Sequence, residues 1–313
     1  MKVGLLVRAD REDISWLQRL GLRSMQWVRF AESPCVEKFE GWESEVDAVQ
    51  RLADEFGITI SAIAALYKNP LDPRQQESSR RVFHRAIDVA SRLGIKTVSG
   101  FCGAVIHQQL NERGGNMVYE PFENHLPEII SYWRPIAQYA ADRGVRIAFE
   151  HCPQGRYHLP MMGYNFLDRP RMWEIFFNEC QLANVGLEWD PSHLICQHID
   201  PLANLKKFVS KVFHVHAKDA RINRDLLREY GVAHPGVAEH RFPGLGEADW
   251  GEIIRTLLEA GYDSDLTIEG WHDPIYRNHL PSASATLRGK NWEEKGVLIA
   301  KETLERFLPT NLP

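Results

Sequence analysis

The chain has few cysteines, and they are not paired. Five occur among 313 residues, an odd number, and none stand in a CxxC spacing: Cys35, Cys102, Cys152, Cys180 and Cys196. A disulfide framework uses an even set and a zinc knuckle uses closely spaced pairs, so this pattern argues against both. Scattered thiols suit a reducing compartment, and we predict that the protein is cytoplasmic.

Long apolar runs are also missing. No segment approaches the roughly 20 apolar residues that a membrane-spanning helix needs. The start, MKVGLLVRADRED, becomes charged too early for a signal peptide. We therefore expect a soluble protein that is not exported and has no membrane partner.

An excess of positive charge is absent as well. The chain has 37 Lys and Arg against 42 Asp and Glu, for a formal net charge of -5. Proteins that bind nucleic acids usually carry a basic patch or stripe, so we expect no nucleic-acid partner.

A glycine-rich turn does not follow the first expected strand, where the sequence reads LLVRADRED. The dinucleotide-binding, doubly wound sheet needs such a GxGxxG turn, which makes that fold the weaker alternative.

The chain does contain a regular alternation of short β-rich runs and longer segments with helical periodicity. Eight strands are expected: Val3 to Val7, Met25 to Phe30, Ile58 to Leu66, Thr97 to Cys102, Arg146 to Glu150, Val185 to Asp190, Val212 to His216 and Leu266 to Glu269. Glycines that can cap helices precede several of them: Gly57, Gly94, Gly144 and Gly261. This order predicts an α/β fold, a single (β/α)8 TIM barrel domain over residues 1–313.

Three connections after strands are longer than the barrel needs. They follow strands five, seven and eight, at Pro153 to Pro170, Ala220 to Trp250 and His272 to Asn291. Loops after strands lie on the catalytic face of such a barrel, so these extended loops are expected to cover a substrate. Tyr157, Tyr164 and Phe166 are candidates to line that cover.

The last four strands each end in a side chain that can bind a metal. IAFE ends at Glu150, VGLEWD at Asp190 and LTIE at Glu269, while VFHVHAKD contains His216. The carboxyl ends of barrel strands converge on one cavity, so these four side chains can share one ion. Three carboxylates and an imidazole suit Mn2+ or Mg2+, and the histidine also admits Zn2+ or Co2+.

Simpler interpretations compete with this one. A single carboxylate at a strand end is more often a helix N-cap or a solvated charge, so the hypothesis depends on the repetition. His214 and His216 lie on the same face of one strand, and the pattern admits either as the ligand. We choose His216, nearer the strand end, and expect His214 to pack or hydrogen-bond deeper in the barrel.

Polar residues just beyond these strand ends are candidates to bind substrate. His193 and Arg221 would lie above the metal, with Lys218 and His240 as weaker candidates of the same kind. A capping histidine and a surface arginine explain the spacing equally well.

These segments together resemble the xylose isomerase-like superfamily of TIM barrels, in the sugar phosphate isomerase/epimerase group that includes family 2 AP endonucleases. The resemblance is carried by FEH at Glu150, DPSH, HVHAKDAR, FPGLGEADW and IEGWHDP. It covers strands five to eight closely and strands one to four mainly by their rhythm, with NPLDP after the third strand as a looser match.

The resemblance implies that Glu150, Asp190, His216 and Glu269 bind one divalent ion, commonly Mn2+, and that Glu150 and Glu269 also carry protons. His193 and Arg221 match positions that hold substrate in the family. We also predict that Trp271 of IEGWHDP binds substrate. DNA-cleaving relatives hold further zinc ions with histidines on strands three and four, but here those strands end in AALYKNP and SGFCGA. They also favour Asp where Ala238 stands, two residues before His240.

Three functions are compatible with these residues, in order of preference. The first is a metal-dependent isomerase or epimerase of carbohydrate metabolism, acting on a keto-sugar or cyclitol through an enediolate. The second is a lyase that performs metal-assisted β-elimination on a keto-cyclitol or 3-keto-glycoside. The third is a sugar-binding subunit without turnover. No clustered Lys and Arg and no glycine-rich loop indicate a phosphate site, so an uncharged sugar is favoured. The aromatic loops suit pairing in a homo-oligomer as well as covering a substrate.

Overall fold

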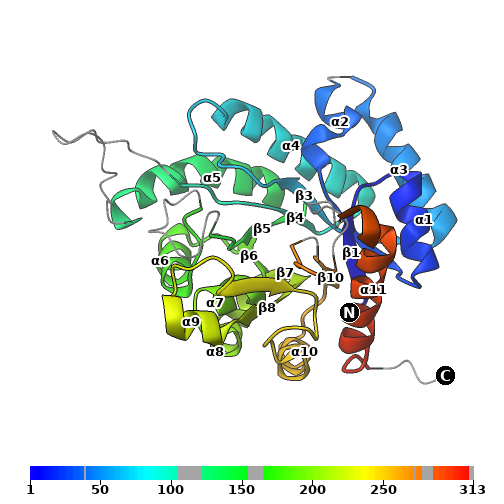
Figure 1. Ribbon diagram of the computed structural model, residues 1–313. Coiled ribbons are helices and arrows are strands. Elements are labelled where there is room, and N and C mark those ends of the chain that lie inside the picture. Colours follow the sequence, from blue (N-terminus) through cyan, green and yellow to red (C-terminus); the bar gives the residue numbers. More distant parts are fainter. Residues whose placement is uncertain (39, 105–121, 154–164, 271, 277–284, 310–313) are drawn as a thin grey trace.

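The computed structural model describes residues 1–38, 40–104, 122–153, 165–270, 272–276 and 285–309. Eight parallel strands close a barrel in the order β1-β10-β7-β6-β5-β4-β3-β2 (Figure 1). The strands are β1 (Val3–Val7), β2 (Ser24–Trp27), β3 (Thr59–Leu66), β4 (Thr97–Gly100), β5 (Arg146–Glu150), β6 (Val185–Trp189), β7 (Val212–Ala217) and β10 (Leu266–Ile268). The predicted (β/α)8 barrel is confirmed.

Helices surround the barrel on its outer side (Figure 1). They are α1 (Arg11–Arg19), α2 (Pro34–Glu37), α3 (Trp42–Phe56), α4 (Gln76–Leu93), α5 (Leu126–Ala141), α6 (Pro170–Cys180), α7 (Pro191–Cys196), α8 (Pro201–Phe208), α9 (Arg224–Tyr230), α10 (Trp250–Glu259) and α11 (Ala285–Glu305). The four predicted glycines all have positive φ, between +63° and +72°, a backbone conformation that residues with a Cβ rarely adopt. They let the chain turn from a helix into the next strand.

The core between the helices and the barrel is rich in aromatic rings. Trp133 of α5 packs edge-on against Phe83 of α4 and Phe149 of β5, with ring centroids 4.9 and 4.6 Å apart. Every residue of β6 and β7 is buried, as expected for a parallel sheet covered on both faces. Polar residues inside these strands must therefore find partners within the protein.

None of the described helices combines the length and apolar character needed to cross a membrane. All five cysteines are free thiols, in agreement with their odd number and wide spacing.

The segment after β7 contains structure that the sequence analysis did not predict. Within the expected loop Ala220 to Trp250, β8 (Asp219–Ile222) and β9 (Ala238–Arg241) pair antiparallel on either side of α9. Four-residue strands rich in charged residues carry too little alternation to be recognised in the sequence. The inner face of this hairpin packs its apolar side chains against Ile195 and Cys196 of α7.

One buried aspartate fixes the end of this excursion. The Asp219 carboxylate accepts hydrogen bonds from the backbone N–H groups of Ala220, Gly244 and Ala248 and from Trp250 Nε1, at 2.8 to 3.2 Å. Gly246 passes so close that a Cβ there would lie 2.1 Å from Asp219 Oδ1. The glycines of FPGLGEADW thus let the loop wrap around this carboxylate.

We predict that Asp219→Ala lowers the free energy of unfolding by at least about 3 kcal/mol, because it leaves several buried N–H groups without an acceptor. Urea denaturation followed by circular dichroism measures the change. Asp249→Ala is the matched control, because the exposed Asp249 caps only the backbone N–H of Glu252. Its expected cost is about 1 kcal/mol. Equal costs for the two variants would contradict the role given to Asp219.

Candidate metal centre

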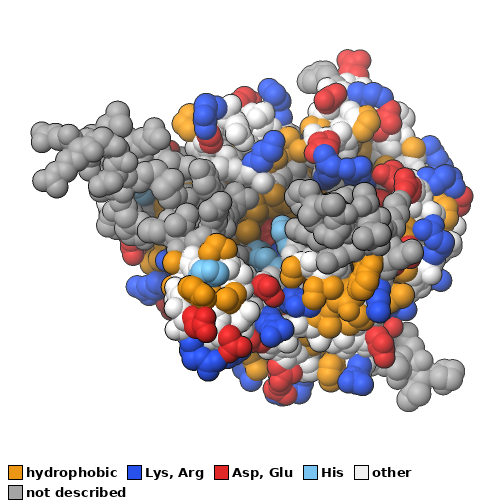
Figure 2. Space-filling view, viewed as in Figure 1, with side chains coloured by type: hydrophobic (Ala, Val, Ile, Leu, Met, Phe, Trp, Pro, Cys, Tyr) orange, Lys and Arg blue, Asp and Glu red, His pale blue; other side chains and the backbone are white. Residues whose placement is uncertain are grey.

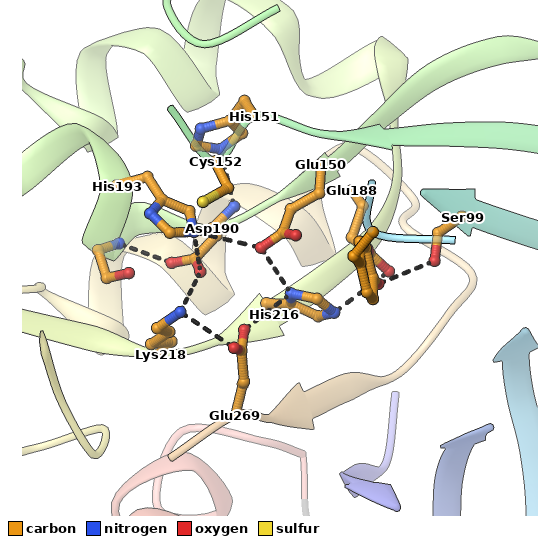
Figure 3. Close-up of polar contacts among 12 residues, drawn as sticks. Ser99, Glu150, His151, Cys152, Glu188, Asp190, His193, His216, Lys218 and Glu269 are labelled. Atoms are coloured by element: carbon orange, nitrogen blue, oxygen red, sulfur yellow. Dashed lines mark hydrogen bonds and ion pairs between the residues drawn. The ribbon is translucent and has the colours of Figure 1, made fainter. Parts of the chain in front are cut away.

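The four predicted ligands meet at the carboxyl ends of neighbouring barrel strands. Glu150 ends β5, Asp190 follows β6, His216 lies near the end of β7 and Glu269 follows β10. One ligand atom from each lies within 4.8 Å of those of the other three, and all four side chains are buried. His216 Nδ1 lies 3.3 Å from Glu150 Oε1 and 3.2 Å from Glu269 Oε2, so both glutamates face the same ring nitrogen (Figure 3).

Asp190 combines a structural role with this placement. It is the N-cap of α7, where its Oδ1 accepts from the backbone N–H of Ser192 at 2.8 Å. Its buried Oδ2 accepts no hydrogen bond from the residues that the structure describes. The helix cap therefore holds one oxygen and leaves the other directed at the cluster.

The donor set fits a divalent cation. Burial raises the pKa of Asp190 to about 7, and the neighbouring Glu269 and Glu150 add to the shift. Carboxylates crowded in a low-dielectric site destabilise one another unless a cation lies between or beside them. Three such oxygens and one imidazole nitrogen are ligands that Mn2+, Mg2+ or Zn2+ accept.

Lys218 supplies a positive charge at the edge of the cluster. Its ammonium group lies 3.1 Å from Glu269 Oε1 and 3.6 Å from Asp190 Oδ2, in a buried position (Figure 3). Burial alone would lower the pKa of this lysine, but Glu269, Asp190 and Glu150 raise it above its ordinary value. Lys218, a weaker candidate for substrate binding in the sequence, thus lies close to two of the four predicted ligands.

The other predicted substrate residues lie at different distances from the cluster. His193 of α7 touches it, with Nε2 3.2 Å from both Glu150 Oε1 and Asp190 Oδ2. Burial, followed by the charge of Lys218, lowers the pKa of His193 well below its usual value, which keeps this ring neutral. The His240 ring on β9 lies 5.2 Å from the His193 ring, between centroids.

Arg221 does not join this group. It lies on β8 opposite Glu239, and its side chain is exposed while its neighbours in the strand are buried. Trp271, Tyr157 and Tyr164 lie outside the described residues. Phe166 is described, and its ring packs against His125 at 5.9 Å.

A second polar group, missed in the sequence analysis, lies deeper in the barrel. Glu188 of β6 is fully buried, and its Oε1 accepts from Gln26 Nε2 at 2.6 Å and lies 2.9 Å from His214 Nδ1. Its Oε2 accepts from the Tyr67 hydroxyl at 2.7 Å. One indication of this group was present in the sequence, because Glu188 stands two residues before Asp190. Side chains two apart on a strand point to the same face of the sheet.

Glu188, His214 and His216 also lie close enough together to hold an ion. Both oxygens of Glu188, however, already accept hydrogen bonds. Burial would raise the pKa of this carboxyl, but His216 and His214 lower it below its ordinary range. We therefore assign these residues to a hydrogen-bond network, and assign the candidate ion site to the group with Asp190.

Histidine side chains reach the surface on one face of the molecule. In the middle of the face seen in Figure 2, histidine side chains are visible at the bottom of a depression.

This chain is similar to several known proteins, and the solved structures among them have the same fold. The inosose dehydratase of Clostridium perfringens is 24% identical over 224 residues, which cover 68% of this chain and 70% of that protein. The solved IolI protein with a bound zinc atom aligns with a TM-score of 0.67 at 16% identity, covering 99% of this chain and 100% of that one. The solved 3-keto-D-glucoside 4-epimerase from E. coli aligns with a TM-score of 0.63 at 14% identity, covering 95% and 98%.

The model of one protein family, described as the xylose isomerase-like TIM barrel, matches residues 14–296. That range includes every barrel strand apart from β1. It also includes all four residues of the candidate ion site. The resemblance inferred from the motifs is confirmed, and the chain belongs to the xylose isomerase-like TIM barrel family.

Proposed function

We propose that this protein is a divalent-metal-dependent isomerase or epimerase that acts on a keto-sugar or cyclitol. The observation that carries the proposal is the pair of buried glutamates, Glu150 and Glu269, that both face His216 Nδ1 at the carboxyl end of the barrel. A pair of carboxylates around one small space can remove a proton from one position of a substrate and return it at another.

The ion would be held by Glu150, Asp190, His216 and Glu269. When bound, it polarises the substrate carbonyl and adjacent hydroxyl and stabilises the negative charge of an enediolate. We favour Mn2+, with Mg2+, Co2+ or Zn2+ compatible with the same donors. The zinc atom in the solved IolI protein supports a divalent ion in this fold.

The protein's own side chains divide the remaining work. Burial would raise the pKa of Glu269, but Lys218 and His216 lower it well below its usual value, so this carboxylate is ionised and can accept a proton. The Lys218 ammonium can donate a hydrogen bond to a substrate oxygen beside Glu269. The neutral His193 and His240 can donate to or accept from sugar hydroxyls. Arg221 and Trp271 remain predicted substrate residues.

A lyase is the second candidate, and the inosose dehydratases among the relatives favour it. Elimination begins with the same removal of a proton next to a carbonyl. It then needs an acid to protonate the departing hydroxyl, and the Lys218 ammonium group lies at the cluster where it could serve. The two reactions therefore share their first step and differ only in whether a proton returns or a hydroxyl departs.

Three further assignments remain predictions. The barrel is expected to form one domain over residues 1–313, and the free thiols support a cytoplasmic location. Assembly into a homo-oligomer is the third.

The test of the proposal is to incubate the metal-loaded protein with inosose, 3-keto-glucosides and common ketoses in deuterium oxide. Solvent deuterium in a rearranged or inverted sugar indicates isomerisation or epimerisation. Loss of water or aglycone, with an absorbing enone, indicates the lyase. Chelator-treated protein is the control, and it should be inactive until the ion is restored. The absence of both deuterium incorporation and loss of water or aglycone with metal-loaded protein would count against both reactions.

We predict that Glu269→Gln reduces turnover by about a hundredfold to ten-thousandfold, since it removes a proton carrier while keeping the shape of the side chain. Metal affinity should fall as well, because a charged ligand is lost. The exposed Glu259→Gln on α10 is the control and should leave both unchanged. If Glu269→Gln kept full turnover on a substrate found above, this carboxylate would not be the base.

We also predict that metal affinity rises with pH through about pH 7. The raised pKa of Asp190, at about 7, means that the metal-free site holds a proton below that pH, and the ion must displace it. The raised pKa of His216 acts in the same direction. Titration of the metal at about pH 6, pH 7 and pH 8 checks the trend. Asp190→Asn should bind more weakly and with a smaller pH dependence, and an equal dependence in this variant would contradict the assignment.

A further inference from the structure

The two nitrogens of the His216 ring face different surroundings. Nδ1 faces Glu150 and Glu269 in the candidate ion site. Nε2 faces the barrel interior, 2.8 Å from Gln26 Oε1 and 3.3 Å from Glu188 Oε1. Figure 3 shows the ring between these two sides, with Glu269 and Glu150 on one and Glu188 and Ser99 on the other.

The direction of the Gln26 amide is set by its neighbours. Its nitrogen donates to Glu188 Oε1 at 2.6 Å and to Ser99 Oγ at 2.9 Å. An ionised carboxylate only accepts hydrogen bonds, so the NH2 group of Gln26 has to face Glu188. The amide oxygen is then the atom that faces His216.

This direction determines which nitrogen carries the hydrogen when the His216 ring is neutral, as a metal ligand must be. The amide oxygen only accepts, so the Nε2 atom beside it has to be the donor. Nδ1 is then the ring nitrogen whose lone pair can be directed at the site between Glu150 and Glu269.

We propose that Gln26 is a positioning residue that retains a hydrogen on His216 Nε2 and so makes Nδ1 the metal ligand. Glu188 acts one step further away by orienting the Gln26 amide, and Tyr67 helps to hold Glu188. Partners of this kind fix the orientation of a ligating histidine and affect metal affinity without touching the ion. The proposal rests on the ion site of the proposed function.

The first test is Gln26→Met, which keeps the length of the side chain and removes both hydrogen-bonding groups. Zn2+ affinity, measured by competition with a fluorescent chelator, should fall about tenfold to a hundredfold. Ser24→Ala is the matched control, because Ser24 lies two residues earlier on β2, is equally buried, and donates to Asp265 instead. It should bind Zn2+ as the unchanged protein does. Circular dichroism and thermal unfolding of the metal-free proteins check that both variants fold.

The second test is a double-mutant cycle with Glu188→Gln. An amide at position 188 no longer dictates the direction of Gln26, so this change alone should also weaken Zn2+ binding. If both residues act through the same hydrogen bond, the loss in the double variant is smaller than the product of the two single losses. Fully multiplicative losses would indicate independent roles and overturn the proposal.

The third test needs no substitution. Nitrogen-15 NMR of histidine-labelled, Zn2+-loaded protein should show His216 with Nε2 protonated and Nδ1 bound to zinc, with His216→Gln used to assign the signals. Coordination through Nε2 would overturn the proposal directly.

The outcomes also separate this inference from the proposed function. Zn2+ binding that depends on Asp190 and Glu269 but stays within about threefold of normal in Gln26→Met keeps the ion site and removes the role of Gln26. Zn2+ binding that is indifferent to Asp190→Asn and Glu269→Gln removes the ion site itself.

Discussion

The mutual repulsion of buried carboxylates is the constraint on which the rest of this structure depends. The buried Glu150, Asp190 and Glu269 converge within 4.8 Å, and Glu188 lies just below them. Such a group is unstable unless each oxygen has a donor or a cation beside it. The surrounding polar residues meet this need in different ways. Lys218 contributes a charge, the N-cap of α7 occupies one oxygen of Asp190, and Gln26 and Tyr67 donate to Glu188.

The barrel makes this concentration of charge possible by supplying rigid positions. Parallel pairing brings the ends of β5, β6, β7 and β10 side by side, although they are far apart in the chain. Each side chain then lies near the end of a buried strand or on the residue that follows it. Apolar and aromatic packing outside the barrel thus stabilises an arrangement inside it that is electrostatically unfavourable without a cation.

The convergence of the four candidate ligands could be predicted because each stands where an apolar run ends, and strand ends in a parallel barrel share one edge. The eight strands could be predicted for a similar reason, since their β-rich runs alternate with helical periodicity and capping glycines. Gln26 and Glu188 could not be, because a single polar residue inside a buried strand gives no sign of its partner. Their contact joins β2 and β6 across the closed barrel, and such a contact depends on closure. The exposure of Arg221 was equally hidden, because it depends on the pairing of β8 with β9.

The attachment of the β8–β9 hairpin has a consequence for how this protein could diversify. Asp219, which follows Lys218 in the chain, accepts hydrogen bonds from Gly244 and Ala248 and so holds the chain where it returns from the hairpin. In the described residues, strands β8 and β9 pair with each other and not with the barrel. Exposed residues between Ile222 and Ala238 can therefore change while both attachment points stay in place, whereas Leu226, Leu227 and Val237 are constrained by their packing with Ile195 and Cys196. The fold separates exposed residues that can vary from residues that must keep their positions, and new binding contacts could arise among the first without disturbing the second.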